Sequence, residues 1–144
     1  MVFFSDEGAF YPARIERVWA LSTAHGPHHS EIHPKVSNSR VEFTGPTSGL
    51  ATWDMEWNGA TVSMKVRFTH ARPLGKLQEY LEGPLAGSRM FVYYKPAGDR
   101  TEVRVVADLR SPTMSDGELV RAVRHFLQYE FEEDLHYLET ALPP

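Results

Sequence analysis

The chain ends in one long amphipathic helix, and this feature limits what the preceding residues can form. Ser115 and Glu118 make a capping box that marks the start of a helix expected over residues 116–142. A helix of about twice the average length can cross a whole sheet. Apolar residues recur every three or four positions and predict one buried stripe. The stripe consists of Leu119, Val120, Val123, Leu127, Phe131, Leu135, Leu138 and Leu142.

The middle of the chain is made of segments in which apolar and polar residues alternate. This period of two is typical of strands with one buried and one solvated face. Asn58-Gly59, between two such segments, is a strong signal for a two-residue hairpin. The inward parity of one segment stays open, because Leu77 and Leu81 compete there with Tyr80. Strands are predicted for residues 3–11, 41–43, 51–57, 62–68, 77–82, 90–94 and 103–109.

A short helix follows the first strand. Ile15, Val18, Trp19 and Ser22 share one side of a helix predicted over residues 14–24. Residues 25–34 are expected to form a loop or one short helical turn. The element order predicts an α+β domain over residues 1–144, a curved antiparallel sheet wrapped around the long C-terminal helix, with room for a ligand between them.

Composition excludes several classes of protein. The chain has no cysteine, which excludes a disulfide scaffold, a thiol nucleophile and a cysteine zinc site. Its net charge is −4 and its basic residues are dispersed, so no nucleic-acid partner is expected. The N-terminus does not resemble a signal peptide, and no run of about 18 apolar residues exists. We therefore expect a cytoplasmic protein without stable membrane insertion.

The strongest candidate site is the concave face of the predicted sheet. Its large apolar side chains would project toward the C-terminal helix and line a pocket for an apolar ligand. The alternative is a plain packed core. Buried indole and phenol groups at Trp53, Trp57 and Tyr94 would fix the polar end of a ligand. The predicted ligand-binding residues are Trp53, Met55, Trp57, Met64, Val66, Phe68, His70, Tyr94, Val103, Val105, Val123, Leu127 and Phe131.

Histidines form the second group of candidates. His70 continues the inward parity of residues 62–68 and would act as a base or hydrogen-bond partner, unless it lies exposed at the rim. The segment with His25, His28, His29 and His33 has ligand types suited to zinc. Two prolines bracket this segment and no continuous helix fixes its geometry. It is therefore interpreted as surface histidines, or as a gate over the cavity mouth.

No other residues of the sequence indicate a catalytic or binding site. His125 and His136, with Glu132, Glu133 and Asp134 nearby, are assigned to the solvated face of the last helix. The sequence contains no phosphate-binding loop and no nucleophile elbow. No catalytic residue, no metal site and no cofactor are predicted.

Four stretches resemble motifs of one protein superfamily. They are Pro12-Ala13-Arg14-Ile15-Glu16-Arg17-Val18-Trp19-Ala20-Leu21, His33-Pro34-Lys35-Val36, Gly83-Pro84-Leu85-Ala86-Gly87 and Pro96-Ala97-Gly98-Asp99-Arg100-Thr101-Glu102-Val103. The pattern resembles the START-like, or SRPBCC, superfamily, which includes polyketide cyclase-like proteins, and it covers almost the whole chain. The resemblance implies a helix-grip fold with a hydrophobic cavity. It implies no universal catalytic residue. The tryptophan usual in the second motif is absent.

Three functions follow as hypotheses. The first is binding or transport of an apolar small molecule, either a lipid or an aromatic, polyketide-like compound. The second is an aromatase/cyclase-type enzyme in which His70, Tyr80 or Tyr94 moves protons. The third is an accessory protein that acts through a surface patch containing Trp19 or Phe3. The sequence does not identify a protein partner.

Overall fold

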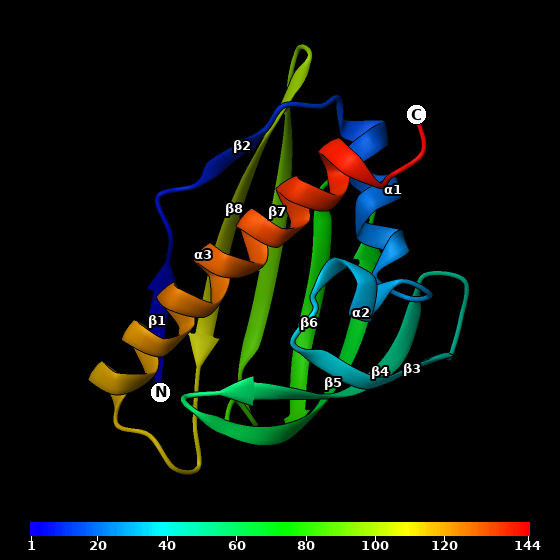
Figure 1. The fold of residues 1–144 in the computed structure, drawn as a ribbon. Coiled ribbons are helices and arrows are strands. Elements are labelled where there is room, and N and C mark those ends of the chain that lie inside the picture. Colours follow the sequence, from blue (N-terminus) through cyan, green and yellow to red (C-terminus); the bar gives the residue numbers. More distant parts are fainter.

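A computed structural model describes all 144 residues of the chain. Eight strands and three helices follow one another in an α+β arrangement (Figure 1). The elements are β1 (Val2–Ser5), β2 (Ala9–Tyr11), α1 (Ile15–Ala24), α2 (His29–Ile32), β3 (Val36–Phe43), β4 (Ser48–Trp57), β5 (Ala60–Ala71), β6 (Gly75–Glu82), β7 (Arg89–Ala97), β8 (Arg100–Leu109) and α3 (Asp116–Thr140).

All eight strands form one antiparallel sheet. Its order is β1-β8-β7-β6-β5-β4-β3, and β2 also pairs with β8. The sheet curves, and α3 runs diagonally across its concave side, with α1 and α2 beside the last turns of the helix (Figure 1). The predicted fold class, a curved antiparallel sheet around a long C-terminal helix, is confirmed.

The β4–β5 hairpin confirms the turn predicted at Asn58-Gly59. Asn58 has φ of 49° and Gly59 has φ of 80°, so both central residues take the left-handed backbone that this turn requires. Trp57 pairs with Ala60 directly across the turn. Farther along the hairpin, a Cβ atom on Gly49 would lie 2.6 Å from the ring of Phe68. Glycine at this position therefore makes room for the Phe68 ring.

The single strand predicted over residues 3–11 is wrong, because the segment forms two strands. Ser5 pairs with Val106 and Ala9 pairs with Val103, so the N-terminal segment holds one residue more than the stretch it faces. The extra residue is absorbed where Gly8 adopts φ of 84°. Nearby, the Asp6 carboxylate accepts a hydrogen bond from the backbone N–H of Val105 at 3.0 Å.

Strands β3 and β6 add detail to the predictions made from the sequence. β3 begins at Val36, five residues before the predicted start at Val41. In β6 the open question of parity is resolved in favour of Tyr80, which is buried, whereas Leu81 is exposed. Gln78 shares the inward parity of Tyr80.

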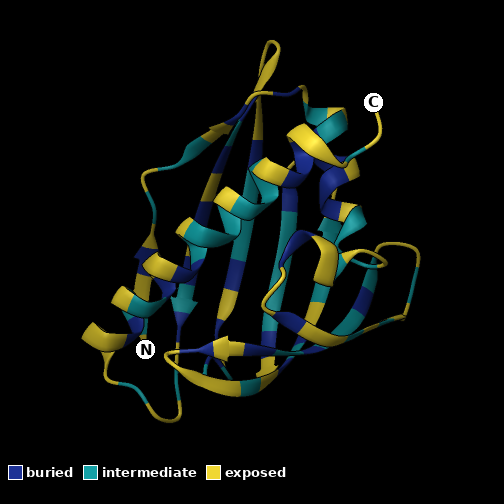
Figure 2. Cartoon of the chain, viewed as in Figure 1, coloured by how far each residue is buried: buried dark blue, intermediate teal, exposed yellow.

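Helix α3 starts with the predicted capping box. The Ser115 hydroxyl accepts from the backbone N–H of Glu118, and the Glu118 carboxylate accepts from the N–H of Ser115. Buried positions lie along the side of α3 that faces the sheet (Figure 2). They include Phe126 and Tyr137, which the predicted stripe omitted.

The core consists of two clusters joined by α3. The first lies between the sheet and the N-terminal half of the helix, where Leu119, Val123 and Phe126 are buried. The second lies between α1 and the C-terminal half of the helix, where Tyr137 and Leu138 are buried. The helix is thus firmly packed near both ends.

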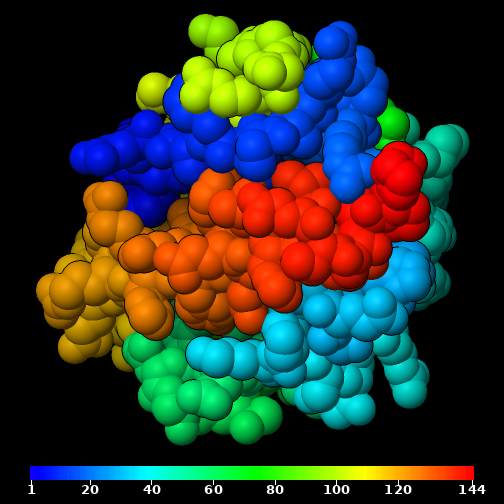
Figure 3. Space-filling model, turned by 45° about the horizontal axis from the view of Figure 1, so that its top comes forward, coloured from blue at the N-terminus to red at the C-terminus, as the bar shows by residue number.

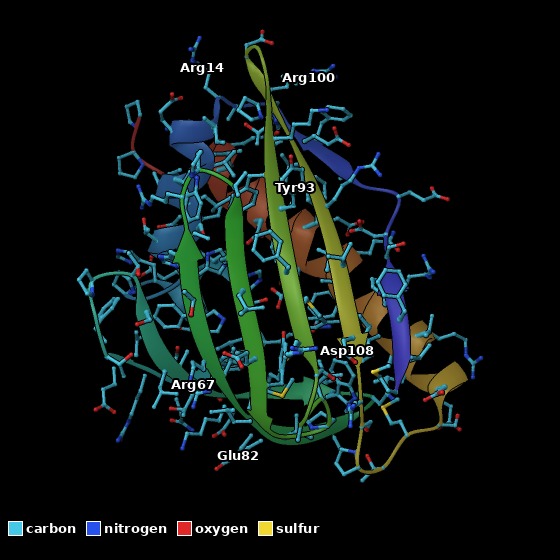
Figure 4. The ribbon with its side chains drawn as sticks, turned by 180° about the vertical axis from the view of Figure 1, so that it is seen from behind. Arg14, Arg67, Glu82, Tyr93, Arg100 and Asp108 are labelled. Carbon is cyan, nitrogen blue, oxygen red and sulfur yellow. The ribbon has the colours of Figure 1, made fainter.

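The convex face of the sheet carries charge, as the alternation predicts. Arg67 and Asp108 project from this face, away from α3 (Figure 4). The four arginines with outward parity, at positions 40, 67, 104 and 110, are all exposed.

Trp19 is buried, whereas Phe3 is 72% exposed. No helix of the chain is both long and apolar enough to cross a membrane.

Arg17 of α1 holds the C-terminal end of α3. Its guanidinium donates to the backbone carbonyls of Leu138 at 3.0 Å, Leu142 at 3.1 Å and Pro143 at 2.7 Å. These carbonyls have no partner within the helix, and a cation there also interacts favourably with the helix dipole. The contact fixes α3 at the end opposite its capping box.

We expect Arg17→Met to lower the free energy of unfolding by about 1–3 kcal/mol, because three carbonyls lose a charged donor. Urea denaturation followed by circular dichroism measures the loss. Arg14→Met is the matched control, since Arg14 is exposed and makes only an ion pair at 3.8 Å with Glu16. Equal effects of the two variants would contradict the assigned role of Arg17.

We expect Phe126→Ala to cost about 3–5 kcal/mol, because this ring is buried in the first cluster. Phe131→Ala should cost about half as much or less. Phe131 is only partly buried, so truncation of its ring removes fewer contacts. Urea denaturation of the two variants compares these losses. Similar losses would mean that the Phe131 ring is as tightly packed as that of Phe126.

Candidate functional site: a cavity with a buried histidine–carboxylate cluster

A cavity of about 740 Å³ lies between the concave face of the sheet and the middle of α3. The helix contributes residues from Arg124 to Asp134 to its wall, which is the stretch between the two core clusters. On the surface, α3 runs between the N-terminal strands and the segment that contains α2 (Figure 3). About half of the lining residues are apolar.

Most of the predicted ligand-binding residues border this cavity. The nine that do so are Trp53, Val66, Phe68, His70, Tyr94, Val103, Val105, Leu127 and Phe131. They come from β4, β5, β7, β8 and α3, and all except His70 belong to the apolar part of the lining.

The other four predicted residues, Met55, Trp57, Met64 and Val123, lie outside the lining, and the prediction is corrected there. They share inward parity, but they sit where the N-terminal half of α3 rests on the sheet. The Trp57 ring packs on Phe126 at 5.6 Å between centroids. These side chains belong to the first core cluster.

The indole groups do not act as predicted. Trp53 lines the cavity, but its Nε1–H donates to the sulfur of Met55 at 3.3 Å. Trp57 has no hydrogen-bond partner for its Nε1–H and lies outside the cavity. Neither N–H is therefore presented to the cavity as a free donor. Tyr94 packs edge-on against Trp19 at 5.2 Å.

His70 borders the cavity, as its parity predicts, and it is partly buried. Its ring lies between Phe68 at 5.3 Å and Trp19 at 5.6 Å. Burial lowers the pKa of His70, and the charges of Lys76 and Arg72 lower it further. The imidazole is therefore neutral at pH 7 and can accept a proton.

The interpretation of the histidine-rich segment as surface residues is wrong for three of its four members. His33 is only 3% exposed, and His25 and His29 are partly buried along the cavity wall. His28 is exposed and pairs with Glu31 at 3.1 Å. The short helix α2 and the turns around it fold this segment against α3. The assignment of Glu133 and Asp134 to the solvated face is wrong, because both contact His33.

Asp134 of α3 is the centre of this cluster. Its Oδ1 lies 2.9 Å from Nε2 of His25 and 3.1 Å from Nε2 of His33, and its Oδ2 accepts from the Tyr11 hydroxyl at 3.1 Å. Burial would raise the pKa of Asp134, but the two imidazoles outweigh it and hold this pKa well below its usual range. Asp134 is therefore an anion buried among polar partners.

Two more carboxylates approach the other side of the His33 ring. Nδ1 of His33 lies 2.6 Å from Glu130 and 3.1 Å from Glu133. Burial would lower the pKa of His33, but the contacts with Asp134 and Glu130 raise it to about 10. An isolated buried imidazole would be neutral, so the surrounding negative charge controls this site.

His29 completes the cluster as a neutral ring. Its Nδ1 lies 3.0 Å from the Ser39 hydroxyl, and its ring packs edge-on against Trp53 at 5.0 Å. Burial, followed by the charges of His25 and His33, lowers the pKa of His29 to about 3. His29 therefore joins the polar cluster to the apolar wall.

One signal in the sequence could have found this cluster. Leu127, Glu130, Phe131 and Asp134 follow the spacing i, i+3, i+4 and i+7, so two carboxylates share a helix face with two apolar residues. Carboxylates on an inward face need partners. His125 and His136, in contrast, are exposed as expected.

Comparison with known proteins identifies the fold. A START superfamily protein from Mycobacterium smegmatis superposes with a TM-score of 0.77 at 12% identity, with 95% of this chain and 97% of that chain covered. Ara h 8.0201 gives 0.78 at 12% identity, with 96% of this chain and 98% of that chain covered. The Zhui aromatase/cyclase from Streptomyces sp. R1128 gives 0.72 at 11%, with 95% and 90% covered.

No family model and no curated protein sequence matches the chain. The solved structures all share the helix-grip architecture, and the resemblance inferred from the sequence motifs is confirmed at the level of fold. Identities of 11–12% carry no residue-by-residue assignment of function.

Proposed function

We propose that this chain, which has the helix-grip fold of START-like proteins, binds a small molecule with an apolar body and a polar end. The observation that carries the proposal is the cavity of about 740 Å³, which falls within the usual size range of small-molecule sites. Its lining includes an apolar wall and the histidine–carboxylate cluster. An apolar body fits the first, and a polar group fits the second.

The apolar wall and the histidine–carboxylate cluster together favour one orientation of the ligand. Val66, Phe68 and Val105 offer apolar contact on the sheet side, opposite Leu127 and Phe131 of α3. The cluster around Asp134 lies toward α1 and α2. A purely apolar ligand would cover charged groups there without replacing the contacts they make with water, which is unfavourable. Lipids with a polar head and hydroxylated aromatic compounds both match this arrangement.

We expect an apolar fluorescent probe to bind the native chain at micromolar concentration, which corresponds to about −8 kcal/mol. Leu127→Trp should weaken this binding at least tenfold with little loss of stability, because the larger side chain enters the cavity. Leu81→Trp is the matched control, since Leu81 is exposed on the other face of the sheet. Unchanged binding in Leu127→Trp would contradict the assignment of the cavity.

Tryptophan emission gives an independent test of the site. Trp53 borders the cavity and Trp57 does not, so the change in emission on probe binding should be lost in Trp53→Phe and retained in Trp57→Phe. The reverse result would move the ligand to the packed end of the sheet. Native mass spectrometry of purified protein then identifies any compound that copurifies.

A second candidate function is an aromatase/cyclase-type enzyme, and the ionisable groups in the cavity favour it. His70 is a neutral base there, and burial together with Glu130 raises the pKa of Tyr80, which keeps its phenol protonated. A base and an acid on one wall are the groups that enolisation of a ketone requires. Several of the structures that superpose, Zhui among them, are described as aromatase/cyclase or ARO/CYC proteins.

Hydrogen–deuterium exchange at a ketone separates the enzyme from the binder. We expect the chain to accelerate exchange of the acidic C–H of α-tetralone in D₂O, and His70→Gln to reduce this acceleration roughly 100-fold. Tyr93→Phe is the control, because Tyr93 faces the convex side of the sheet (Figure 4). Binding of the ketone without acceleration would exclude this second function and leave the binding proposal intact.

The accessory-protein alternative has less support. It required an exposed patch that contains Trp19 or Phe3, but Trp19 is buried against Tyr94 and only Phe3 is exposed. Exposed apolar side chains such as Phe3 are ordinary on a protein surface.

A further inference from the structure

Three atoms that carry lone pairs meet at one point of the cavity wall. Nε2 of His25 and Nε2 of His33 are 3.1 Å apart, and Oδ1 of Asp134 lies 2.9 Å from the first and 3.1 Å from the second. His25 directly follows α1, His33 directly follows α2, and Asp134 belongs to α3. The fold thus brings together residues up to 109 positions apart.

The other nitrogen of each ring determines where its proton lies. Nδ1 of His25 is 2.9 Å from the carbonyl oxygen of Leu21, which can only accept a hydrogen bond. Nδ1 of His33 faces the carboxylates of Glu130 and Glu133. Both Nδ1 atoms therefore carry hydrogen. In the neutral rings, each Nε2 then presents a bare lone pair to the other and to Asp134.

With Asp134 ionised, no arrangement of protons on the two rings satisfies all three contacts. With both rings neutral, every contact joins two lone pairs. A proton on one Nε2 leaves the other Nε2 and the Asp134 oxygen facing each other as acceptors. Protons on both rings place two N–H donors 3.1 Å apart. A cation above the centre of the triangle satisfies all three atoms at once, since each donates a lone pair to it.

We propose that His25, His33 and Asp134 form a binding site for a divalent first-row transition metal ion. Two imidazole nitrogens and one carboxylate oxygen are ligands that such ions prefer. An ion about 2.1 Å from each atom would subtend roughly 90° between neighbouring ligands, given edges near 3 Å. The three residues therefore occupy one face of the ion, and because all of them border the cavity, the remaining positions open into it.

Outer contacts hold each proposed ligand in place. Nδ1–H of His25 donates to Leu21, Nδ1–H of His33 donates to Glu133, and the Tyr11 hydroxyl donates to Asp134. Metal-binding histidines in proteins almost always have such a partner, which fixes the tautomer and the ring orientation. Glu130 and Glu133 also add negative charge beside the site, which favours a cation.

The site goes beyond the proposed function and does not rest on it. A metal ion would be held by protein groups whether or not the cavity contains a ligand. Its open face would bind the polar end of a ligand directly. Failure of the probe-binding experiments would leave the metal site untouched, and failure of metal binding would leave the cavity untouched.

Isothermal titration of the chelator-treated full chain with Zn²⁺ tests the proposal. We expect one Zn²⁺ per chain, and a rise in melting temperature because the ion binds only the folded arrangement. His33→Gln and Asp134→Asn should abolish this binding. Tyr11→Phe, which removes only an outer contact, should weaken it about 10–100-fold. His28→Gln is the matched control and should bind as tightly as the unmodified chain, since His28 is exposed.

Titration with Co²⁺ tests which residues bind the ion. Its visible absorption should appear in the unmodified chain and in His28→Gln, and should be lost in His25→Gln. Circular dichroism confirms that each variant is folded, and His25→Gln replaces His33→Gln or Asp134→Asn if either fails to fold. Absence of Zn²⁺ binding, or uptake of several ions that is unchanged in His25→Gln, would overturn the proposal.

Discussion

The placement of α3 is the constraint on which the rest of the structure depends. The capping box of Ser115 and Glu118 fixes its start, and the guanidinium of Arg17 fixes its end. The first turns pack on the sheet and the last turns pack on α1. Because both ends are held, the middle of the helix can stand away from the curved sheet without loss of the fold. The cavity is the space that this leaves, and it exists because packing at the two ends supplies the stability.

The middle of α3 can therefore carry residues that a packed helix would exclude. Glu130 and Asp134 lie on the inward face, where carboxylates are costly unless they are paired. His25 and His33 provide the partners, and they come from the segment around α2, where Ile32 is buried in the second cluster. Removing one member of such a cluster leaves an uncompensated buried charge. The buried charges of the cluster are therefore unfavourable for folding by themselves, and their presence supports a role in binding.

The sequence predicts the architecture well because its signals are local. Alternation identifies strands, Asn58-Gly59 identifies the hairpin, and the spacing of the last helix identifies its buried side. The sequence predicts the candidate site less well. Met64 and Val66 share one parity, but only Val66 borders the cavity, because the line along which α3 leaves the sheet is set by tertiary packing. The histidine cluster depends on contacts across the whole chain, and spacing within one loop could not reveal it.

The cluster also changes what the fold implies about specificity. Structures with this architecture at 11–12% identity share only the fold, so selectivity must come from the side chains of each chain. Here a hydrocarbon would fit the apolar wall and still be disfavoured, because it would displace water from Asp134 and its imidazoles without replacing those hydrogen bonds. A ligand with an oxygen-rich end would avoid this cost, and would gain a direct bond if the site holds a metal ion. The polar end of the cavity would therefore select among ligands by rejection as much as by attraction.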